Sequence, residues 1–241
     1  MLQTLSSLGR ETARIVLHAS CVACGGELPW RSRTASCCAA CWGSLPALAR
    51  SKCRFCAAPW DGDDPEFVCG PCLSDRIPVD WTEAWGSYRG ALERVLHAFK
   101  FQRHDFFSDP LAGLIEENVL RRGDLEFDVV IPVPMHRAKA RRRGYNQAEL
   151  LARALARRLR LRCDPRLLSK TRDLDAQSKL PREARAVNVR GAFLASAQVA
   201  DRRILLVDDV CTTGETIRAC ATELLRAGAS RVAAAVVAKT E

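Results

Sequence analysis

Two adjacent carboxylates, Asp208 and Asp209, follow a run of aliphatic residues in the segment ILLVDDVCTTGETIRAC, residues 204–220. A carboxylate at the end of a buried strand costs free energy unless it meets water, a hydrogen-bond donor or a ligand. Open α/β sheets bind ligands at the carboxyl ends of their strands. We therefore take Asp208 and Asp209 as the candidate catalytic pair.

The residues that follow this pair suit a phosphate group. Gly214 allows a tight turn, and threonines lie just before a predicted helix, TIRACATELLRAG, at 216–228. Backbone amides and hydroxyls at the start of a helix favour anions. The combination indicates a sugar phosphate, with the acids accepting hydrogen bonds from ribose hydroxyls and the loop holding the 5-phosphate. The alternative is an ordinary strand–turn–helix in which Asp and Thr only cap the helix.

Four Cys-x-x-Cys pairs occur before residue 73: Cys21/Cys24, Cys38/Cys41, Cys53/Cys56 and Cys69/Cys72. Two thiolates at this spacing can share one metal ion, and two pairs complete a tetrahedral site that favours zinc over magnesium. Thirteen residues separate Cys24 from Cys38, and twelve separate Cys56 from Cys69. These near-equal gaps predict two successive zinc ribbons. An interleaved pairing, an iron–sulfur cluster, and metal-free buried or redox-active cysteines are the alternatives.

We expect both zinc ions to be structural, because four thiolates leave no open position for water or substrate. Metal binding would supply the folding free energy that a short, loop-rich region lacks. Four cysteines stand outside the pairs: Cys37, Cys163, Cys211 and Cys220.

A third feature is the segment HRAKARRRGYNQ (136–147), which contains no acid. Its cations and its aromatic residue are Arg137, Lys139, Arg141, Arg142, Arg143 and Tyr145. Such a segment could hold pyrophosphate, or follow the backbone of single-stranded nucleic acid while the tyrosine stacks on a base. The simpler interpretation is a solvated basic helix face.

Hydrophobic patterns predict the elements that position these residues. Buried strands are expected at 127–134, 202–210 and 231–239, and an amphipathic helix at 146–160. Alternating strands and helices indicate a mostly parallel sheet covered by helices.

The chain divides into two regions. Residues 1–80 are expected to form an amphipathic N-terminal helix and the double zinc ribbon, and residues 81–241 the α/β domain. The net charge of +9, from 37 basic and 28 acidic residues, favours polyanions, although an arginine-rich proteome gives the same balance. No apolar run approaches the roughly 20 residues of a membrane helix. We expect a cytoplasmic protein that does not insert into membranes.

The 204–220 segment resembles the phosphoribosyl pyrophosphate (PRPP) motif of type I phosphoribosyltransferases, with a hydrophobic strand, two acids and a T-T-G-x-T loop. Two more segments resemble elements of the ComF family of competence-associated proteins: IPVPMHRAKARRRGYNQAELLARALA (131–156) and QSKLPREARAVNVRGAF (177–193). The cysteine region is similar to the double zinc ribbon found ahead of such domains. The resemblance covers nearly the whole chain.

This resemblance implies a type I phosphoribosyltransferase-like domain that binds PRPP with Mg²⁺ and transfers the phosphoribosyl group with loss of pyrophosphate. Asp208 and Asp209 would bind the ribose hydroxyls. The substrate-binding residues would be Val210, Cys211, Thr212, Thr213, Gly214, Glu215 and Thr216, with Pro132, Val133 and Pro134 on the pyrophosphate side. Leu174 and Glu215 depart from the family pattern, which has threonine and a small residue at these positions.

The function implied is support of DNA uptake in natural transformation, with single-stranded DNA and other DNA-uptake proteins as partners. Two alternatives share the fold: a regulator that senses PRPP without transferring it, and a DNA-binding factor without transferase activity. The sequence names no acceptor for the transfer.

Overall fold

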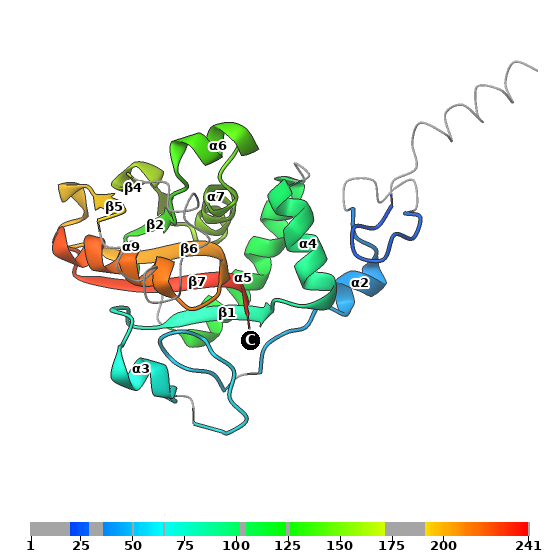
Figure 1. Cartoon of the computed structure of the whole chain (residues 1–241), viewed down its shortest axis with the longest axis horizontal. Helices are drawn as coiled ribbons and strands as arrows, with labels where there is room; N and C mark the ends of the chain where they lie inside the picture. Colours follow the sequence, from blue (N-terminus) through cyan, green and yellow to red (C-terminus); the bar gives the residue numbers. More distant parts are fainter. Residues whose placement is uncertain are drawn as a thin grey trace, which may run out of the picture.

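The computed structural model of the chain describes residues 20–28, 36–49, 51–64, 66–101, 105–123, 126–171 and 191–240. Its centre is a five-stranded parallel sheet in the order β1-β7-β6-β2-β3 (Figure 1). These strands are β1 (Thr82–Ser87), β2 (Val129–Pro132), β3 (Arg162–Cys163), β6 (Arg203–Cys211) and β7 (Arg231–Lys239). A separate antiparallel pair consists of β4 (Leu168–Lys170) and β5 (Phe193–Ala195).

The described α-helices are α2 (Ala39–Gly43), α3 (Gly70–Ser74), α4 (Gly90–Phe101), α5 (Ser108–Arg122), α6 (Arg137–Arg143), α7 (Gln147–Leu159) and α9 (Glu215–Arg226). The described residues also form short 3-10 helices, namely η2 (Asp105–Phe107), η3 (Pro165–Leu167) and η5 (Ala197–Val199). Within the described part of the chain, no helix combines the length and the apolar character needed to cross a membrane.

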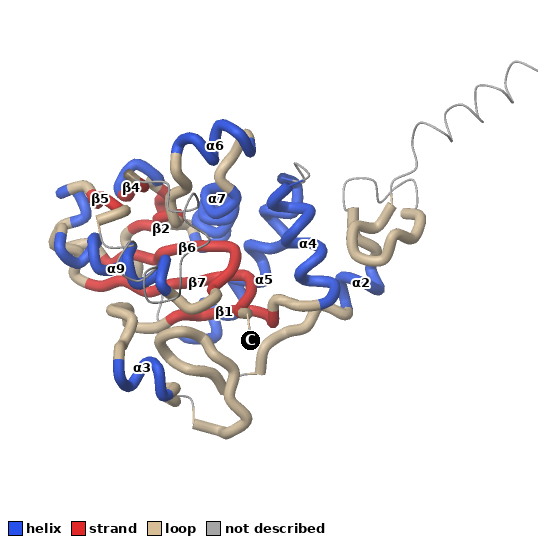
Figure 2. The backbone as a smooth tube through the Cα atoms, viewed as in Figure 1, coloured by secondary structure: helices blue, strands red, loops and turns tan. Residues whose placement is uncertain are grey.

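The sheet is buried on both faces, and Figure 2 shows helices on both sides of its strands. Leu205 and Val207 of β6 belong to the core shared with α4, α5 and α7. Ile204 and Leu206, the alternate residues of the same strand, belong to the core shared with α9. Successive side chains of a strand point to opposite faces, so a strand covered on both sides reads as the continuous aliphatic run seen here.

The two cysteine regions belong to different hydrophobic cores. The first knuckle, which we define as residues 20–45, places Cys21 and Leu45 in the core of α4, α5 and α7. The second knuckle, residues 51–77, places Cys53 and Ile77 in the core of α9. Figure 1 shows the first knuckle (blue) beside α4 and the second (cyan) alongside β1. Both knuckles therefore complete the hydrophobic core of the α/β sheet.

The predicted parallel sheet flanked by helices, with cysteine clusters ahead of it, is confirmed. The expected strand at 127–134 is the shorter β2, and the helix expected at 146–160 is α7, which Asn146 caps by accepting a hydrogen bond from the amide of Ala148 at 3.1 Å. The predicted N-terminal helix and most of the 177–193 segment lie outside the described residues. The boundary at residue 80 stays a prediction.

Candidate functional site

The two acids lie within β6, where this strand extends past its neighbour β2. Pro132, the last residue of β2, pairs with Val207, whereas Asp208 pairs with Val236 of β7. Both acids lie inside the strand expected at 202–210, because β6 runs from Arg203 to Cys211. The register between β2 and β6 ends at the pair of Pro132 with Val207, so among the described residues β2 supplies no partner for the acids.

Asp208 is half-buried, and its Oδ1 accepts a hydrogen bond from the amide of Asp209 at 2.8 Å. Burial, followed by the charge of Asp209, raises the pKa of Asp208 to about 8, and the positive charges of Lys100 and Lys170 only partly oppose this. Two adjacent carboxylates in a poorly solvated site cannot both ionise freely. Burial and the neighbouring charge therefore favour the protonated form of the Asp208 carboxyl more than in an exposed aspartate.

Lys100, at the end of α4, faces the second acid. Its Nζ lies 3.2 Å from Oδ2 of Asp209, whose side chain is only 6% exposed. The same ammonium group lies 5.7 Å from the centre of the Tyr88 ring, within the range of a cation–π contact. The sequence analysis gave Lys100 no role. The spacing of Leu92, Leu96 and Phe99 is that of a buried helix face and could have indicated the helix that carries this lysine.

A pocket of about 240 Å³ lies beside this ion pair; we call it the basic pocket. Its lining residues are Lys100, Phe101, Lys139, Arg142 and Arg143. Four of the five are cations, and the described part of the pocket contains no acid. A pocket of this charge suits a pyrophosphate or phosphate group.

The loop between β6 and α9 is the candidate phosphate loop, and it consists of Thr212, Thr213 and Gly214. The two threonines are exposed, and Gly214 has a φ of 87°, a conformation that favours glycine. Buried Lys239 donates from Nζ to the carbonyl oxygen of Thr212 at 2.7 Å. The loop is therefore fixed from β7 while its hydroxyls remain accessible.

Glu215 and Thr216 lie in the first turn of α9 and not in the loop. The Glu215 carboxylate pairs with Nε of Arg218 at 3.6 Å. This ion pair offsets the negative charge that Glu215 brings next to a phosphate site. Val210 and Cys211 complete β6, with Cys211 buried.

The segment Pro132, Val133 and Pro134 continues β2 toward α7. The amide of Val133 donates to the carbonyl oxygen of Val207 at 2.8 Å. Asn146, the cap of α7, donates from Nδ2 to the carbonyl oxygen of Val133 at 3.1 Å. Pro132 and Val133 therefore lie directly beside the strand that carries the acids, and the role of the segment in binding stays a prediction.

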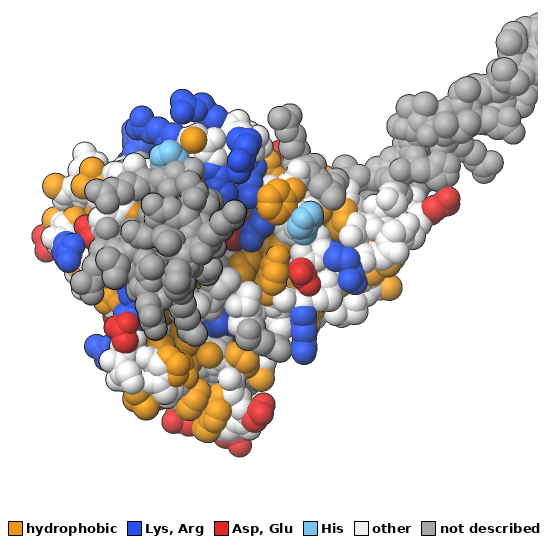
Figure 3. All heavy atoms as spheres, viewed as in Figure 1, with side chains coloured by type: hydrophobic (Ala, Val, Ile, Leu, Met, Phe, Trp, Pro, Cys, Tyr) orange, Lys and Arg blue, Asp and Glu red, His pale blue; other side chains and the backbone are white. Residues whose placement is uncertain are grey.

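The basic segment forms helix α6, and Figure 3 shows Lys and Arg side chains gathered over it and toward α4. Arg137 and Arg141 are exposed and have no acidic partner among the described residues. Tyr145 is half-buried, and its hydroxyl donates to the carbonyl oxygen of Phe99. Phe101 is 59% exposed, and its ring centre lies 4.7 Å from the guanidinium carbon of Arg143. Phe101 thus adds an exposed aromatic face that sequence reasoning missed.

The cysteines form two groups in chain order: Cys21, Cys24, Cys38 and Cys41, then Cys53, Cys56, Cys69 and Cys72. Within each group the sulfur atoms lie within 4.8 Å of one another. The successive arrangement is confirmed, and the interleaved alternative is wrong. Backbone amides donate to sulfur atoms in both groups. The amide of Cys38 donates to Cys21 Sγ at 3.3 Å, and the amide of Cys69 donates to Cys53 Sγ at 3.4 Å.

The thiols of each cluster differ sharply in acidity. A hydrogen bond from Cys56 lowers the pKa of Cys53 to about 4 against the opposing effect of burial, and the same bond raises the pKa of Cys56. In the first cluster burial raises the pKa of Cys21, but backbone hydrogen bonds outweigh it and bring the value to about 6. Four thiols in contact ionise together only beside a cation, so both clusters fit a four-coordinate metal ion.

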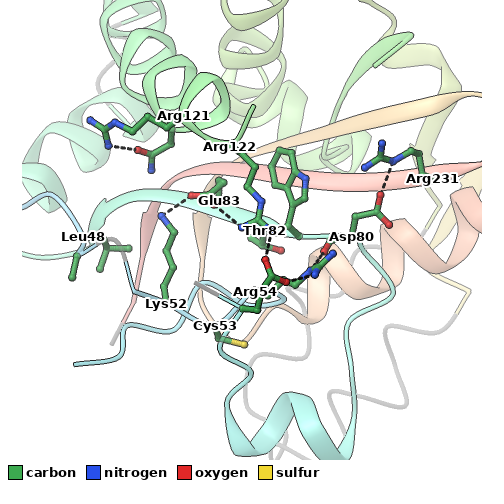
Figure 4. Close-up of a pocket in the computed structure, with 14 residues that line it drawn as sticks. Leu48, Lys52, Cys53, Arg54, Asp80, Thr82, Glu83, Arg121, Arg122 and Arg231 are labelled. Atoms are coloured by element: carbon green, nitrogen blue, oxygen red, sulfur yellow. Dashed lines mark hydrogen bonds and ion pairs between the residues drawn. The ribbon is translucent and has the colours of Figure 1, made fainter. Parts of the chain in front are cut away.

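A larger hollow, of about 840 Å³, lies at the opposite end of the sheet, near the first residues of β1 and β7 (Figure 4). Its lining residues are Leu48, Ala49, Lys52, Cys53, Arg54, Glu66, Asp80, Trp81, Thr82, Glu83, Asn118, Arg121, Arg122 and Arg231. The basic side chains are paired: Lys52 with Glu83 at 2.5 Å, Arg231 with Asp80 at 2.6 Å, Arg122 with Glu83 at 3.6 Å, Arg54 with Glu66, and Arg121 with Glu117. The Lys52–Glu83 pair joins the second knuckle to β1, and a further pair of Arg122 with Glu66 at 3.6 Å joins it to α5. Of the predicted site residues only Cys53 lines this hollow.

Comparison with known proteins places these features in context. The family model described as the phosphoribosyl transferase domain matches residues 145–241. DNA utilization protein YhgH of Escherichia coli O6:H1 is 33% identical over 187 residues, which cover 76% of this chain and 82% of that protein. Competence protein F of Haemophilus influenzae is 30% identical over 171 residues, covering 68% of this chain and 75% of that protein. A purine phosphoribosyltransferase from Pyrococcus horikoshii aligns with a TM-score of 0.34 and 17% identity, over 55% of this chain and 82% of that one.

Proposed function

This chain belongs to the ComF family of competence-associated proteins, and we propose that it binds PRPP at the acids of β6 and single-stranded DNA along α6. In this proposal it acts in the cytoplasm in the uptake or use of DNA, with zinc in its two cysteine clusters. The relatives named for DNA utilization and competence support the process.

The observation that carries the PRPP proposal is the position of Asp208 and Asp209 between the phosphate loop and the basic pocket. The loop would hold the 5-phosphate, the acids would accept hydrogen bonds from the ribose hydroxyls, and the basic pocket would hold the pyrophosphate. A bound Mg²⁺ would neutralise part of the pyrophosphate charge, since that ion prefers oxygen ligands.

Phosphoribosyl transfer at this site would break the bond between the ribose anomeric carbon and pyrophosphate and form a bond from that carbon to a nucleophilic atom of the acceptor. Positive charge then builds on the ribose ring, and negative charge builds on the departing pyrophosphate. Lys100, Arg142 and Arg143 would stabilise that negative charge, while the acids fix the ribose. The chain contributes position and electrostatics, which are the main protein contributions to such a transfer.

The DNA proposal is carried by α6 and its neighbour Phe101. Arg137 and Arg141 are exposed cations without acidic partners in the described structure, so they are available to backbone phosphates. The exposed ring of Phe101 offers a surface on which a base can stack. DNA on α6 would lie beside the basic pocket, close enough for the two ligands to influence each other.

Equilibrium binding of both ligands to one preparation tests this function. We expect Mg·PRPP to bind in calorimetry and labelled oligothymidylate to bind by fluorescence anisotropy. Release of pyrophosphate that requires a nucleobase and is matched by formation of the corresponding nucleotide would establish transfer. Saturable PRPP binding without release with any nucleobase would favour the PRPP sensor, and DNA binding without PRPP binding would leave a DNA-binding factor.

A further inference from the structure

The phosphate loop is held from the second knuckle as well as from the sheet. A Cβ atom placed on Gly214 would lie 2.4 Å from Cδ1 of Ile77, so the Ile77 side chain packs directly on the glycine backbone. Ile77 is 1% exposed, and it shares a core with Cys211 and with Cys53, Cys56 and Cys72 of the second cluster. The Cys211 thiol also points at the carbonyl oxygen of Cys56, with sulfur and oxygen 3.7 Å apart.

Arg218 makes the second connection, from the first turns of α9. Its Nη1 donates to Oδ1 of Asp75 at 2.8 Å and to the carbonyl oxygen of Arg76 at 2.9 Å, and its Nη2 donates to the carbonyl oxygen of Asp75 at 2.7 Å. The backbone amide of Arg218 donates to the carbonyl oxygen of Gly214 at 2.8 Å. One residue therefore ties the last residue of the loop to the segment that follows Cys72.

We propose that Arg218 and Ile77 are positioning residues for the phosphate loop, and that the second cysteine cluster, through residues 75–77, sets the loop's shape and its affinity for a 5-phosphate. This inference rests on the proposed PRPP site. The first cluster belongs to the core of α4, α5 and α7, and the loop contacts given above include none of its residues, so in this proposal it does not set the loop's shape. The second knuckle would thus be a structural part of the PRPP site.

The test separates the two ends of PRPP by using ribose 5-phosphate and pyrophosphate as separate probes in calorimetry. Arg218→Ala is expected to lower the affinity for ribose 5-phosphate by about tenfold, because the loop loses a charge-assisted hydrogen-bond network. The affinity for pyrophosphate should stay within about twofold of that of the unmodified protein. Ile77→Ala is expected to act in the same direction. Arg218→Lys, which keeps one donor group, should restore part of the affinity.

The matched control is Arg226→Ala, on the same helix. Arg226 is 71% exposed in its side chain and pairs only with Glu223 among the described residues, at 2.9 Å. This control should bind both probes as the unmodified protein does. Metal analysis of Arg218→Ala should still find both cluster ions, which shows that the loop changed without loss of metal.

Two results overturn the inference in distinguishable ways. Ribose 5-phosphate affinity that is unchanged in Arg218→Ala and Ile77→Ala would refute the positioning role while leaving the PRPP site intact. Absence of ribose 5-phosphate binding by the unmodified protein would count against the proposed PRPP site, and would refute this inference with it. An equal fall in ribose 5-phosphate and pyrophosphate affinity would show general loss of structure and also refute the positioning role.

Discussion

The ammonium nitrogen of Lys100 lies 3.2 Å from Oδ2 of Asp209, although one residue ends α4 and the other lies far along the chain in β6. The lysine also lines the basic pocket. Lys100 therefore compensates a buried carboxylate and contributes positive charge where a pyrophosphate would bind. A single side chain links the two halves of the candidate site.

Replacing Lys100 by methionine should destabilise the protein. The substitution leaves the nearly buried Asp209 carboxylate without its cation, at a cost of about 1–3 kcal/mol in the free energy of unfolding at neutral pH. Urea denaturation measures this difference. Lys100→Met/Asp209→Asn should be more stable than the sum of the two single changes indicates, because both charges are then removed. Strict additivity in this cycle would mean that the two groups do not interact.

Binding of Mg·PRPP should release a proton near neutral pH. The pKa of Asp208 is raised to about 8 in the free protein, and the ionised carboxylate accepts hydrogen bonds from ribose hydroxyls more strongly than the protonated carboxyl does. Affinity should therefore rise with pH up to about 8, by as much as about tenfold per unit, and then level off.

Calorimetry in two buffers of different ionisation enthalpy measures the protons released. The variant Asp208→Asn provides the baseline. It has no ionisable carboxyl at position 208, so any protons released on binding to it come from PRPP and from other groups of the protein. Equal proton release by Asp208→Asn and the unmodified protein would show that the raised pKa has no part in binding.

Removing two exposed cations of α6 should weaken single-stranded DNA binding through its salt dependence. Arg137→Ala/Arg141→Ala is expected to reduce the slope of log affinity against log salt by about 0.7 for each backbone phosphate that the variant no longer neutralises. The control is Arg153→Ala/Arg157→Ala, since these arginines lie on α7 and already pair with Glu149 and Asp109. An equal reduction of the slope in both variants would indicate attraction by net charge alone.

The two metal clusters should differ in their effect on stability. Cys53, Cys56 and Cys72 are buried against the α9 face, whereas Cys24 is exposed. Cys72→Ser should therefore lower the melting temperature more than Cys24→Ser, and each should reduce bound metal from two ions to one. Calorimetry and metal analysis by mass spectrometry test this, and a larger fall in Cys24→Ser would be inconsistent with the packing.

The sequence was sufficient for the elements whose pattern is local. Residues close together in the chain were enough to predict three features. These are strand β6 from the aliphatic run before Asp208, the start of α7 at Asn146, and the cysteine pairs from their two-residue spacing. The grouping of the cysteines was favoured by near-equal gaps, but only their three-dimensional proximity excludes the interleaved arrangement.

What the sequence did not indicate depends on interactions between distant segments. Strand β1 was missed because it carries Glu83, which is buried only because Lys52 and Arg122 reach it from other elements. The ion pair of Lys100 with Asp209 requires α4 to end beside β6, and no local pattern predicts that. The packing of Ile77 on Gly214 likewise arises only when the second knuckle lies against the sheet.

The most direct test of the proposed PRPP site is calorimetric titration of PRPP with Mg²⁺ into the metal-loaded protein and into Asp208→Asn/Asp209→Asn. We predict saturable binding by the unmodified protein and its loss in the double variant, with the fold and both cluster ions retained. Absence of binding by the unmodified protein, or equal binding by the double variant, would contradict the assignment of this site to PRPP.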